Sequence, residues 1–193
     1  TADLNLAQLG IPEHLLIPLK KAVRKPHGII LVTGPTGSGK STTLYSVLRE
    51  LSVDDLNIMT VEDPIEQVVP GTSQVQVTEK VSFARALRSF LRHDPDVMLV
   101  GEIRDQETAE TAVRAAMTGH MVLSTLHTNS AVAAMSRLAD IGCPSYLVAS
   151  TLVGVVAQRL LRRICQHCKT SYQADEPEKR MLELTDEVTL SKG

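Results

Sequence analysis

Short apolar runs alternate along this chain with segments of helical character. The runs at 28–33, 57–62, 97–102 and 120–126 have the length and residue types of strands that are buried on both faces. The segments 15–23, 40–51, 82–93 and 105–118 are predicted to be helices, and Asn129 is expected to cap another. This alternation predicts an α/β fold with a mainly parallel sheet covered by helices on both faces.

Two segments carry a more specific pattern. Residues 72–78 alternate with a period of two, which predicts an edge or hairpin strand. In 82–93 the apolar residues fall on one helical face, and Arg85, Arg88 and Arg92 fall on another. We expect this arginine stripe to be exposed or to face a neighbouring subunit. An exposed helix with its caps is expected within 174–188.

Composition narrows the class of protein. The chain has 193 residues, of which 43% are hydrophobic, enough for roughly one domain with a sizeable core. A net charge of −2 gives no global basic field that would attract nucleic acid or an anionic membrane. Three cysteines are too few for a disulfide scaffold and suggest a reducing compartment. Because the chain begins at Thr1 without Met, we expect it to be part of a longer cytosolic protein.

A phosphate-binding motif follows the first predicted strand. The segment "GPTGSGKSTT" fits the pattern G-x-x-x-x-G-K-[ST] between a strand and a helix. In such a loop, successive N–H groups surround an anion, the lysine reaches the β- and γ-phosphates, and the serine hydroxyl ligates Mg²⁺. An incidental glycine-rich turn is the alternative. The predicted nucleotide-binding residues are Gly34, Pro35, Thr36, Gly37, Ser38, Gly39, Lys40, Ser41 and Thr42.

Acidic residues end two of the other predicted strands. Glu62 and Asp63 end one, and Glu102 ends another. The carboxyl ends of parallel strands meet at one edge of a sheet, where a carboxylate can serve the Mg²⁺ or the attacking water. A helix cap or an ion pair is the alternative for each acid taken alone. Asp94 and Asp96 lie at the opposite end of their strand, where turn chemistry is an equal explanation.

A histidine lies at each end of the strand predicted at 120–126. His127 follows it, together with Thr125, Thr128 and Asn129, and is a candidate γ-phosphate sensor. His120 begins the strand and is less suited to contact a nucleotide. A structural role is the alternative for both.

Taken together, four blocks resemble the hexameric ATPases of type II secretion and type IV pilus assembly. The blocks are "GPTGSGKSTT", "TVEDPIE", "LRHDPDVMLVGEIRD" and "TGHMVLSTLHTN", and the likeness extends over about residues 4–168. It implies a RecA-like P-loop core that hydrolyses ATP with Mg²⁺. It also implies a cytoplasmic homohexamer that acts at the inner membrane through a platform protein.

The resemblance implies roles for individual residues. Glu102 corresponds to the general base or water-positioning acid, and the family carries a glycine where Gly101 stands. Glu62 is assigned to Mg²⁺ and its bound water, and His127 to γ-phosphate sensing. Arg104 and Asp105 are weaker candidates, as links to a neighbouring subunit or domain.

The chain departs from the family pattern at both ends. Relatives carry an N-terminal domain that supplies arginines to the site, so we expect this stretch alone to bind ATP but to hydrolyse it weakly. Cys165 and Cys168 form half of a tetrahedral zinc site, and no cysteine follows them. Zinc is therefore expected only in the intact protein, with His167 as a weak further candidate. Cys143 is expected to be buried packing.

The expected organisation is a lead-in segment at 1–27, a RecA-like ATPase core at 28–164, and the start of a truncated zinc-type subdomain at 165–193. The leading hypothesis is a motor for secretion or pilus assembly. A conjugative (type IV secretion) ATPase, a RecA-like nucleic-acid motor and a non-hydrolysing scaffold remain alternatives. Arg159, Arg162 and Arg163 form a basic stretch, but with only five Phe and Tyr in the chain we expect no nucleic-acid partner.

Overall fold

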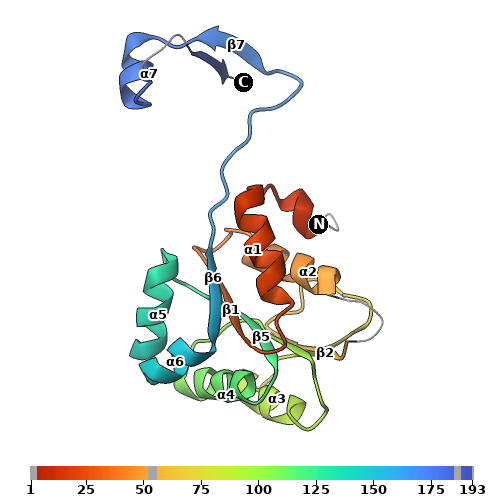
Figure 1. The fold of residues 1–193 in the computed structure, drawn as a ribbon. Coiled ribbons are helices and arrows are strands. Elements are labelled where there is room, and N and C mark those ends of the chain that lie inside the picture. The colour runs from red at the N-terminus through yellow and green to blue at the C-terminus, as the bar shows by residue number, and fades with distance from the viewer. Residues whose placement is uncertain (1–3, 52–55, 185–187, 193) are drawn as a thin grey trace. The chain divides into compact units, whose positions relative to one another are not determined.

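The computed structural model describes residues 4–51, 56–184 and 188–192. The chain divides into two compact units, Thr1–Arg159 and Leu160–Gly193 (Figure 1). The division falls shortly before Cys165, where the predicted zinc-type subdomain begins. Whether the second unit is part of a zinc-type subdomain stays a prediction.

The first unit is built on one six-stranded sheet, in the order β3-β2-β4-β5-β1-β6. Each neighbouring pair in this sheet is parallel, as the pattern of buried strands predicts. The strands are β1 (Gly28–Thr33), β2 (Ile58–Glu62), β3 (Thr72–Gln76), β4 (Val97–Val100), β5 (Met121–Leu126) and β6 (Leu152–Ala157).

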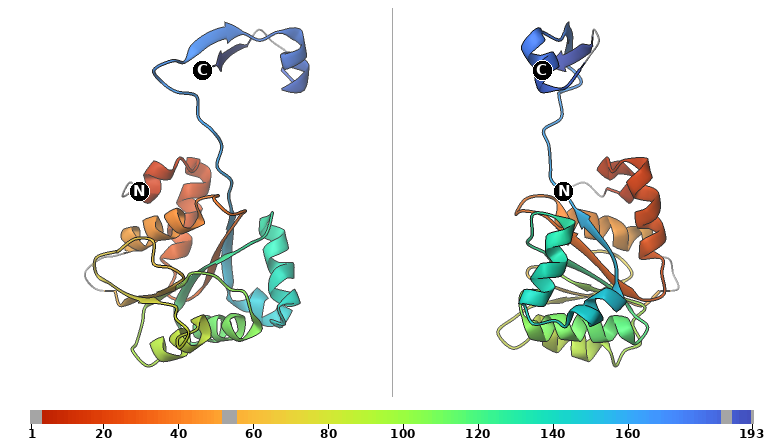
Figure 2. Two further views of the ribbon diagram at one scale, coloured as in Figure 1. Left: turned by 180° about the vertical axis from the view of Figure 1, so that it is seen from behind. Right: turned by 60° about the vertical axis from the view of Figure 1, so that its left-hand side comes forward.

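Helices cover both faces of this sheet (Figures 1 and 2). A 3₁₀ turn, η1, and the helices α1 and α2 pack on one face, and α3, α4, α5 and α6 pack on the other. Their bounds are η1 (Leu6–Leu9), α1 (Glu13–Val23), α2 (Lys40–Leu51), α3 (Phe83–Phe90), α4 (Gln106–Met117), α5 (Ala131–Asp140) and α6 (Ser145–Thr151).

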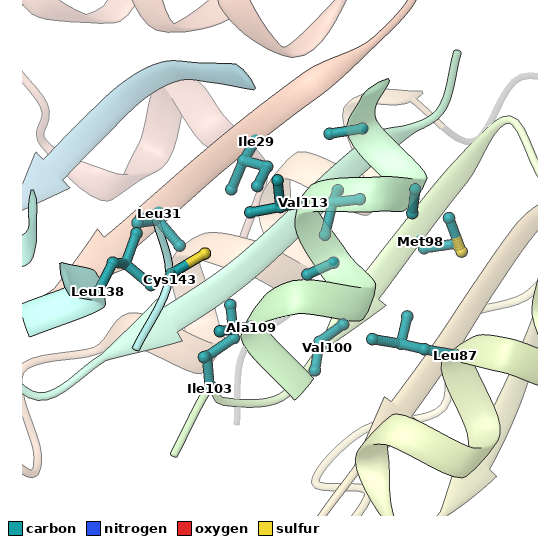
Figure 3. Packing of buried hydrophobic residues seen from close by; sticks show 14 of the residues in the cluster. Ile29, Leu31, Leu87, Met98, Val100, Ile103, Ala109, Val113, Leu138 and Cys143 are labelled. Atoms are coloured by element: carbon teal, nitrogen blue, oxygen red, sulfur yellow. The ribbon is translucent and has the colours of Figure 1, made fainter. Parts of the chain in front are cut away.

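Strand β1 shows why both faces must be covered. Ile29 and Leu31 belong to the cluster under α3 and α4, and Ile30 and Val32 belong to the cluster under α1 and α2. Successive side chains of a strand point to opposite faces, so an all-apolar strand needs an apolar partner on each side. Figure 3 shows the first of these clusters, with Cys143 among its members, as expected for buried packing.

Some details match the sequence-based expectations and others differ. Ser130, and not Asn129, caps α5, because its side chain accepts the N–H of Ala133. The segment 72–78 was expected to form an edge or hairpin strand, and its residues Thr72–Gln76 form the edge strand β3, which pairs in parallel with β2. Arg85 and Arg88 of α3, and Arg92 just after it, are exposed in this chain, which is one of the two expected alternatives. Helix α6 and strand β6 were not anticipated.

The second unit contains a small antiparallel ribbon and one helix. Strand β7 (Thr170–Gln173) pairs with β8 (Thr189–Lys192). Helix α7 (Glu176–Met181) begins with a capping box formed by Asp175 and Glu178. This helix confirms the exposed, capped helix expected within 174–188, although 185–187 lie outside the described residues. Among the described helices of both units, none has the length and apolar character needed to span a membrane.

Leu48 of α2 tests the packing of helix on sheet. Its side chain is fully buried at 0% exposure, so Leu48→Ala should lower the free energy of unfolding by about 2–5 kcal/mol. The matched variant Leu15→Ala, at a site 54% exposed on α1, should change it by less than about 0.5 kcal/mol. Urea unfolding followed by circular dichroism measures both. Equal losses would contradict the assigned burial.

Candidate functional site

The loop that joins β1 to α2 lies at the carboxyl edge of the parallel sheet. Its first residue, Gly34, has φ +150°, and a Cβ there would lie 2.4 Å from the Gln158 carbonyl oxygen and 2.6 Å from Ser38 Oγ. Gly37 and Gly39 have φ of +75° and +83°, in the region that favours glycine. The spacing of glycines that predicts a phosphate loop is therefore required by the backbone itself.

Gln158 fixes this loop from the neighbouring strand. It follows β6, its Nε2 donates to the Ser38 carbonyl at 2.6 Å, and its Oε1 accepts from Thr43 Oγ1 at 2.8 Å. The Gln158 N–H also donates to the Thr33 carbonyl at 2.9 Å. Sequence reasoning missed this residue because β6 itself was not anticipated.

Lys40 is buried at the start of α2, against the loop that precedes it. Its Nζ donates to the carbonyl oxygens of Gly34 and Pro35 at 3.1 and 3.0 Å. Burial lowers the pKa of this ammonium, and the nearby Glu102 carboxylate acts in the opposite direction. The loop thus holds the positive charge of Lys40, which would stabilise an anion bound there.

Glu102 lies two residues beyond the end of β4 and is only 8% exposed. One of its oxygens forms an ion pair with Arg104, and Oε2 lies 3.6 Å from His127 Nε2. Oε2 is buried and has no hydrogen-bond partner among the described residues. A buried carboxylate oxygen in this condition is costly unless a ligand or water meets it. The structure thus brings together three of the predicted catalytic residues, Lys40, Glu102 and His127.

The two residues that follow this acid have separate contacts. Arg104 is exposed and pairs with Glu102 within the same chain. Asp105 caps α4, because its carboxylate accepts the N–H and the hydroxyl of Thr108. The suggested roles of these two residues at a subunit boundary stay predictions.

Two other candidates, Asp96 just before β4 and His120 just before β5, lie at the opposite, amino-terminal edge of the sheet. His120 Nδ1 lies 2.9 Å from the Ala115 carbonyl and 3.2 Å from Thr118 Oγ1, so it fastens the end of α4. Asp96 accepts the N–H of Asn57 at 2.7 Å. These contacts favour the structural alternatives for His120 and Asp96.

Glu62, which ends β2, is 5% exposed and accepts hydrogen bonds at both oxygens. Thr60 Oγ1 and Gln74 Nε2 donate to Oε1 at 2.5 and 3.0 Å, and the Tyr45 hydroxyl donates to Oε2. Burial, and then the hydrogen bond to Glu62, raise the pKa of Tyr45 to about 12. Unlike Glu102, this carboxylate has its hydrogen-bonding capacity largely engaged by the protein.

A different acid of the same segment reaches the phosphate loop. Glu66 Oε1 accepts from Ser41 Oγ at 3.2 Å, whereas Asp63 is exposed. Sequence reasoning did not single out Glu66, because it lies four residues past the end of β2, in a loop whose course the sequence does not reveal. The only signal in the sequence was its acidic character within the segment that follows β2.

These residues fit a nucleotide phosphate with Mg²⁺. Mg²⁺ is usually held by one or two carboxylates together with hydroxyls, waters and phosphate oxygens. The Ser41 hydroxyl and the Glu66 carboxylate lie together at the loop, and Glu102 Oε2 has no hydrogen-bond partner in the part of the chain that the structure describes. A side chain at Gly34 would obstruct the loop's conformation.

The described residues of the second unit do not complete a zinc site around the cysteine pair. Cys165 and Cys168 are exposed, and no group of three or more metal-ligating side chains occurs among the described residues. The N–H groups of His167 and Cys168 lower the pKa of the Cys165 thiol. Tetrahedral zinc needs four ligands, so zinc is not supported for the described part of the chain.

Known proteins match this chain over most of its length. Residues 1–191 match the family described as "Type II/IV secretion system protein". The Type II secretion system ATPase E of Vibrio cholerae is 54% identical over 182 residues, which are 93% of this chain and 36% of that protein. The Type II secretion system protein E of Pseudomonas aeruginosa is 58% identical over 181 residues, with the same coverages. The chain thus spans about a third of the length of these relatives.

Solved structures agree with the sequence relatives. The pilus retraction motor PilT with bound ADP superposes with a TM-score of 0.77 at 43% identity, covering 84% of this chain and 50% of that one. The ATPase DotB of Legionella pneumophila superposes with a TM-score of 0.67 at 28% identity, covering 95% and 54%. These likenesses confirm the RecA-like α/β fold class. The chain belongs to the type II/IV secretion system protein family.

Proposed function

We propose that this chain is the ATP-hydrolysing part of a cytoplasmic motor that powers type II protein secretion or type IV pilus assembly. The family membership and the secretion ATPases among its relatives support an ATPase of a secretion or pilus system. A homohexamer, an inner-membrane platform partner and a location at the inner membrane belong to the same proposal. A type IV secretion ATPase stays the alternative within the family.

The single observation that carries the proposal is Oε2 of Glu102, which is buried beside His127 and has no hydrogen-bond partner among the described residues. A carboxylate with a free oxygen can accept a proton from water, which is the task of a general base. We assign the loop residues Gly34–Thr42 to the phosphates, with Lys40 as their cation and Ser41 on Mg²⁺. His127 is assigned to the γ-phosphate.

The reaction is an in-line displacement on the γ-phosphorus. The water oxygen forms a bond to phosphorus, the bond from phosphorus to the β–γ bridging oxygen breaks, and Glu102 accepts the proton of the water. ADP leaves with the bridging oxygen. Most of the acceleration in such reactions comes from positioning and from neutralisation of charge on the phosphoryl oxygens, which Lys40 and His127 can provide. Bound Mg²⁺ supplies further neutralisation.

The assignment of the acidic residues changes from the sequence-based one. Glu62 was predicted on Mg²⁺, but its carboxylate has three protein donors. Glu66 is the acid whose carboxylate contacts Ser41. We therefore propose Glu66 for the Mg²⁺ side of the site and a supporting role for Glu62.

Lys40→Ala tests nucleotide binding. Loss of charge-assisted hydrogen bonds to phosphate should raise the Kd for ADP by about 10-fold to 100-fold. Lys21→Ala, at an exposed lysine of α1, should leave the Kd unchanged. Titration with a fluorescent ADP analogue measures both, and the proposal fails if Lys40→Ala binds as tightly as the unmodified chain.

Glu102→Gln tests hydrolysis in the full-length protein that contains this chain. Without a base, kcat should fall by about 10²–10⁴-fold while nucleotide binding is retained. Glu79→Gln, at an exposed glutamate, should keep the rate. Secretion or piliation should be lost with Glu102→Gln, whereas a scaffold that works without turnover would retain it. Strong stimulation of the ATPase by DNA would favour a nucleic-acid motor instead.

A further inference from the structure

We infer that Tyr45, Glu62 and Gln74 form a positioning cluster, which fixes the loop between β2 and β3 and so holds Glu66 against the phosphate loop. The inference rests on the proposed function, because the placement of Glu66 matters only where the site binds nucleotide with Mg²⁺. None of the three residues is assigned to contact the nucleotide.

The Tyr45 hydroxyl holds the loop from the side of α2. Its proton goes to Glu62 Oε2, and its oxygen accepts the backbone N–H groups of Glu66 at 3.1 Å and Gln67 at 3.3 Å. A phenol has one donor and two acceptor sites, so every site of this hydroxyl is used. Since the ring is 2% exposed, water cannot readily replace these contacts.

Gln74 holds the same loop from the side of β3. Its Nε2 donates to Glu62 Oε1 at 3.0 Å and to the Gln67 carbonyl at 2.9 Å, and its Oε1 accepts the Val69 N–H at 2.8 Å. The backbone of the loop is therefore hydrogen-bonded to the Tyr45 and Gln74 side chains at three residues, Glu66, Gln67 and Val69. Both of these side chains converge on one carboxylate.

Glu62 determines which way its two partners point. An ionised carboxylate is an acceptor only, so it requires the proton of Tyr45 and the NH₂ group of Gln74. The remaining atoms of both partners are then the ones that the loop needs: lone pairs of the phenol oxygen for two N–H groups, and the amide oxygen for a third. A neutral residue at position 62 would allow either partner to reverse its direction.

Helix α2 couples this cluster to the phosphate loop. Ser41 and Tyr45 are four residues apart and lie on one face of α2. Ser41 contacts the Glu66 carboxylate, and Tyr45 contacts the Glu66 backbone. The helix that begins with the phosphate-binding lysine thus fixes this acid at two points, and removal of the Tyr45 contact should impair only what depends on Glu66.

The test is Tyr45→Phe in the 193-residue chain, with two measurements. Hydrogen exchange of the Glu66 and Gln67 amides should become about 5-fold to 10-fold faster, because their acceptor is gone. The affinity for a fluorescent ADP analogue should fall about 10-fold with Mg²⁺ and stay within about 2-fold in EDTA. Tyr146→Phe removes a hydroxyl at a site 73% exposed and should change neither measurement.

Gln74→Met provides a second variant, which keeps the buried Tyr45–Glu62 contact and side-chain length. It should likewise weaken binding only with Mg²⁺. If both variants bind equally well with Mg²⁺ as the unmodified chain, or lose affinity equally with Mg²⁺ and in EDTA, the cluster is merely structural and the inference is wrong. Lys40→Ala separates the two proposals: normal binding by that variant would defeat the proposed function itself.

Discussion

The site depends on how two glutamates at the carboxyl edge of one sheet are stabilised after burial. Glu62 and Glu102 are 5% and 8% exposed, and a buried carboxylate is costly unless donors or cations meet it. Glu62 receives donors at both oxygens, whereas Glu102 keeps one oxygen without a partner among the described residues. Glu62 therefore holds its hydrogen-bond donors in place. Oε2 of Glu102 is left to accept a proton from water, as proposed.

The parallel sheet makes this contrast possible. Strands β2, β4, β5 and β1 are neighbours in parallel register, so the residues that follow them meet at one edge. Lys40 joins them because the loop after β1 turns sharply at Gly34, where any side chain would collide with Gln158. The conformation of the loop at Gly34 and the burial of the two acids thus both follow from their position at the carboxyl edge of the sheet.

Much of this arrangement could be predicted from the sequence, because the residues involved are set by rules of short range. Apolar runs predicted the buried strands, and a fixed glycine spacing predicted the loop of Lys40 and Ser41. Residues whose role depends on tertiary contacts could not be predicted. Tyr45 falls among the apolar residues of α2 and resembles core, Gln74 is an ordinary polar residue of an edge strand, and Gln158 follows a strand that was not anticipated. Similarly, Asn129 and Ser130 are both good caps, and only the backbone decides between them.

The position of Glu66 depends on support from the residues around it. Glu66 is exposed and lies on a loop, where a side chain loses conformational entropy when it is held in one place. A single contact to Ser41 Oγ at 3.2 Å is a weak restraint for such a residue. Hydrogen bonds from the loop backbone to the buried Tyr45 and the half-buried Gln74 add further restraint, and the charge on Glu62 sets the directions of these two side chains. A carboxylate that is not assigned to any phosphate contact can in this way contribute to the site through the order that it imposes on its neighbours.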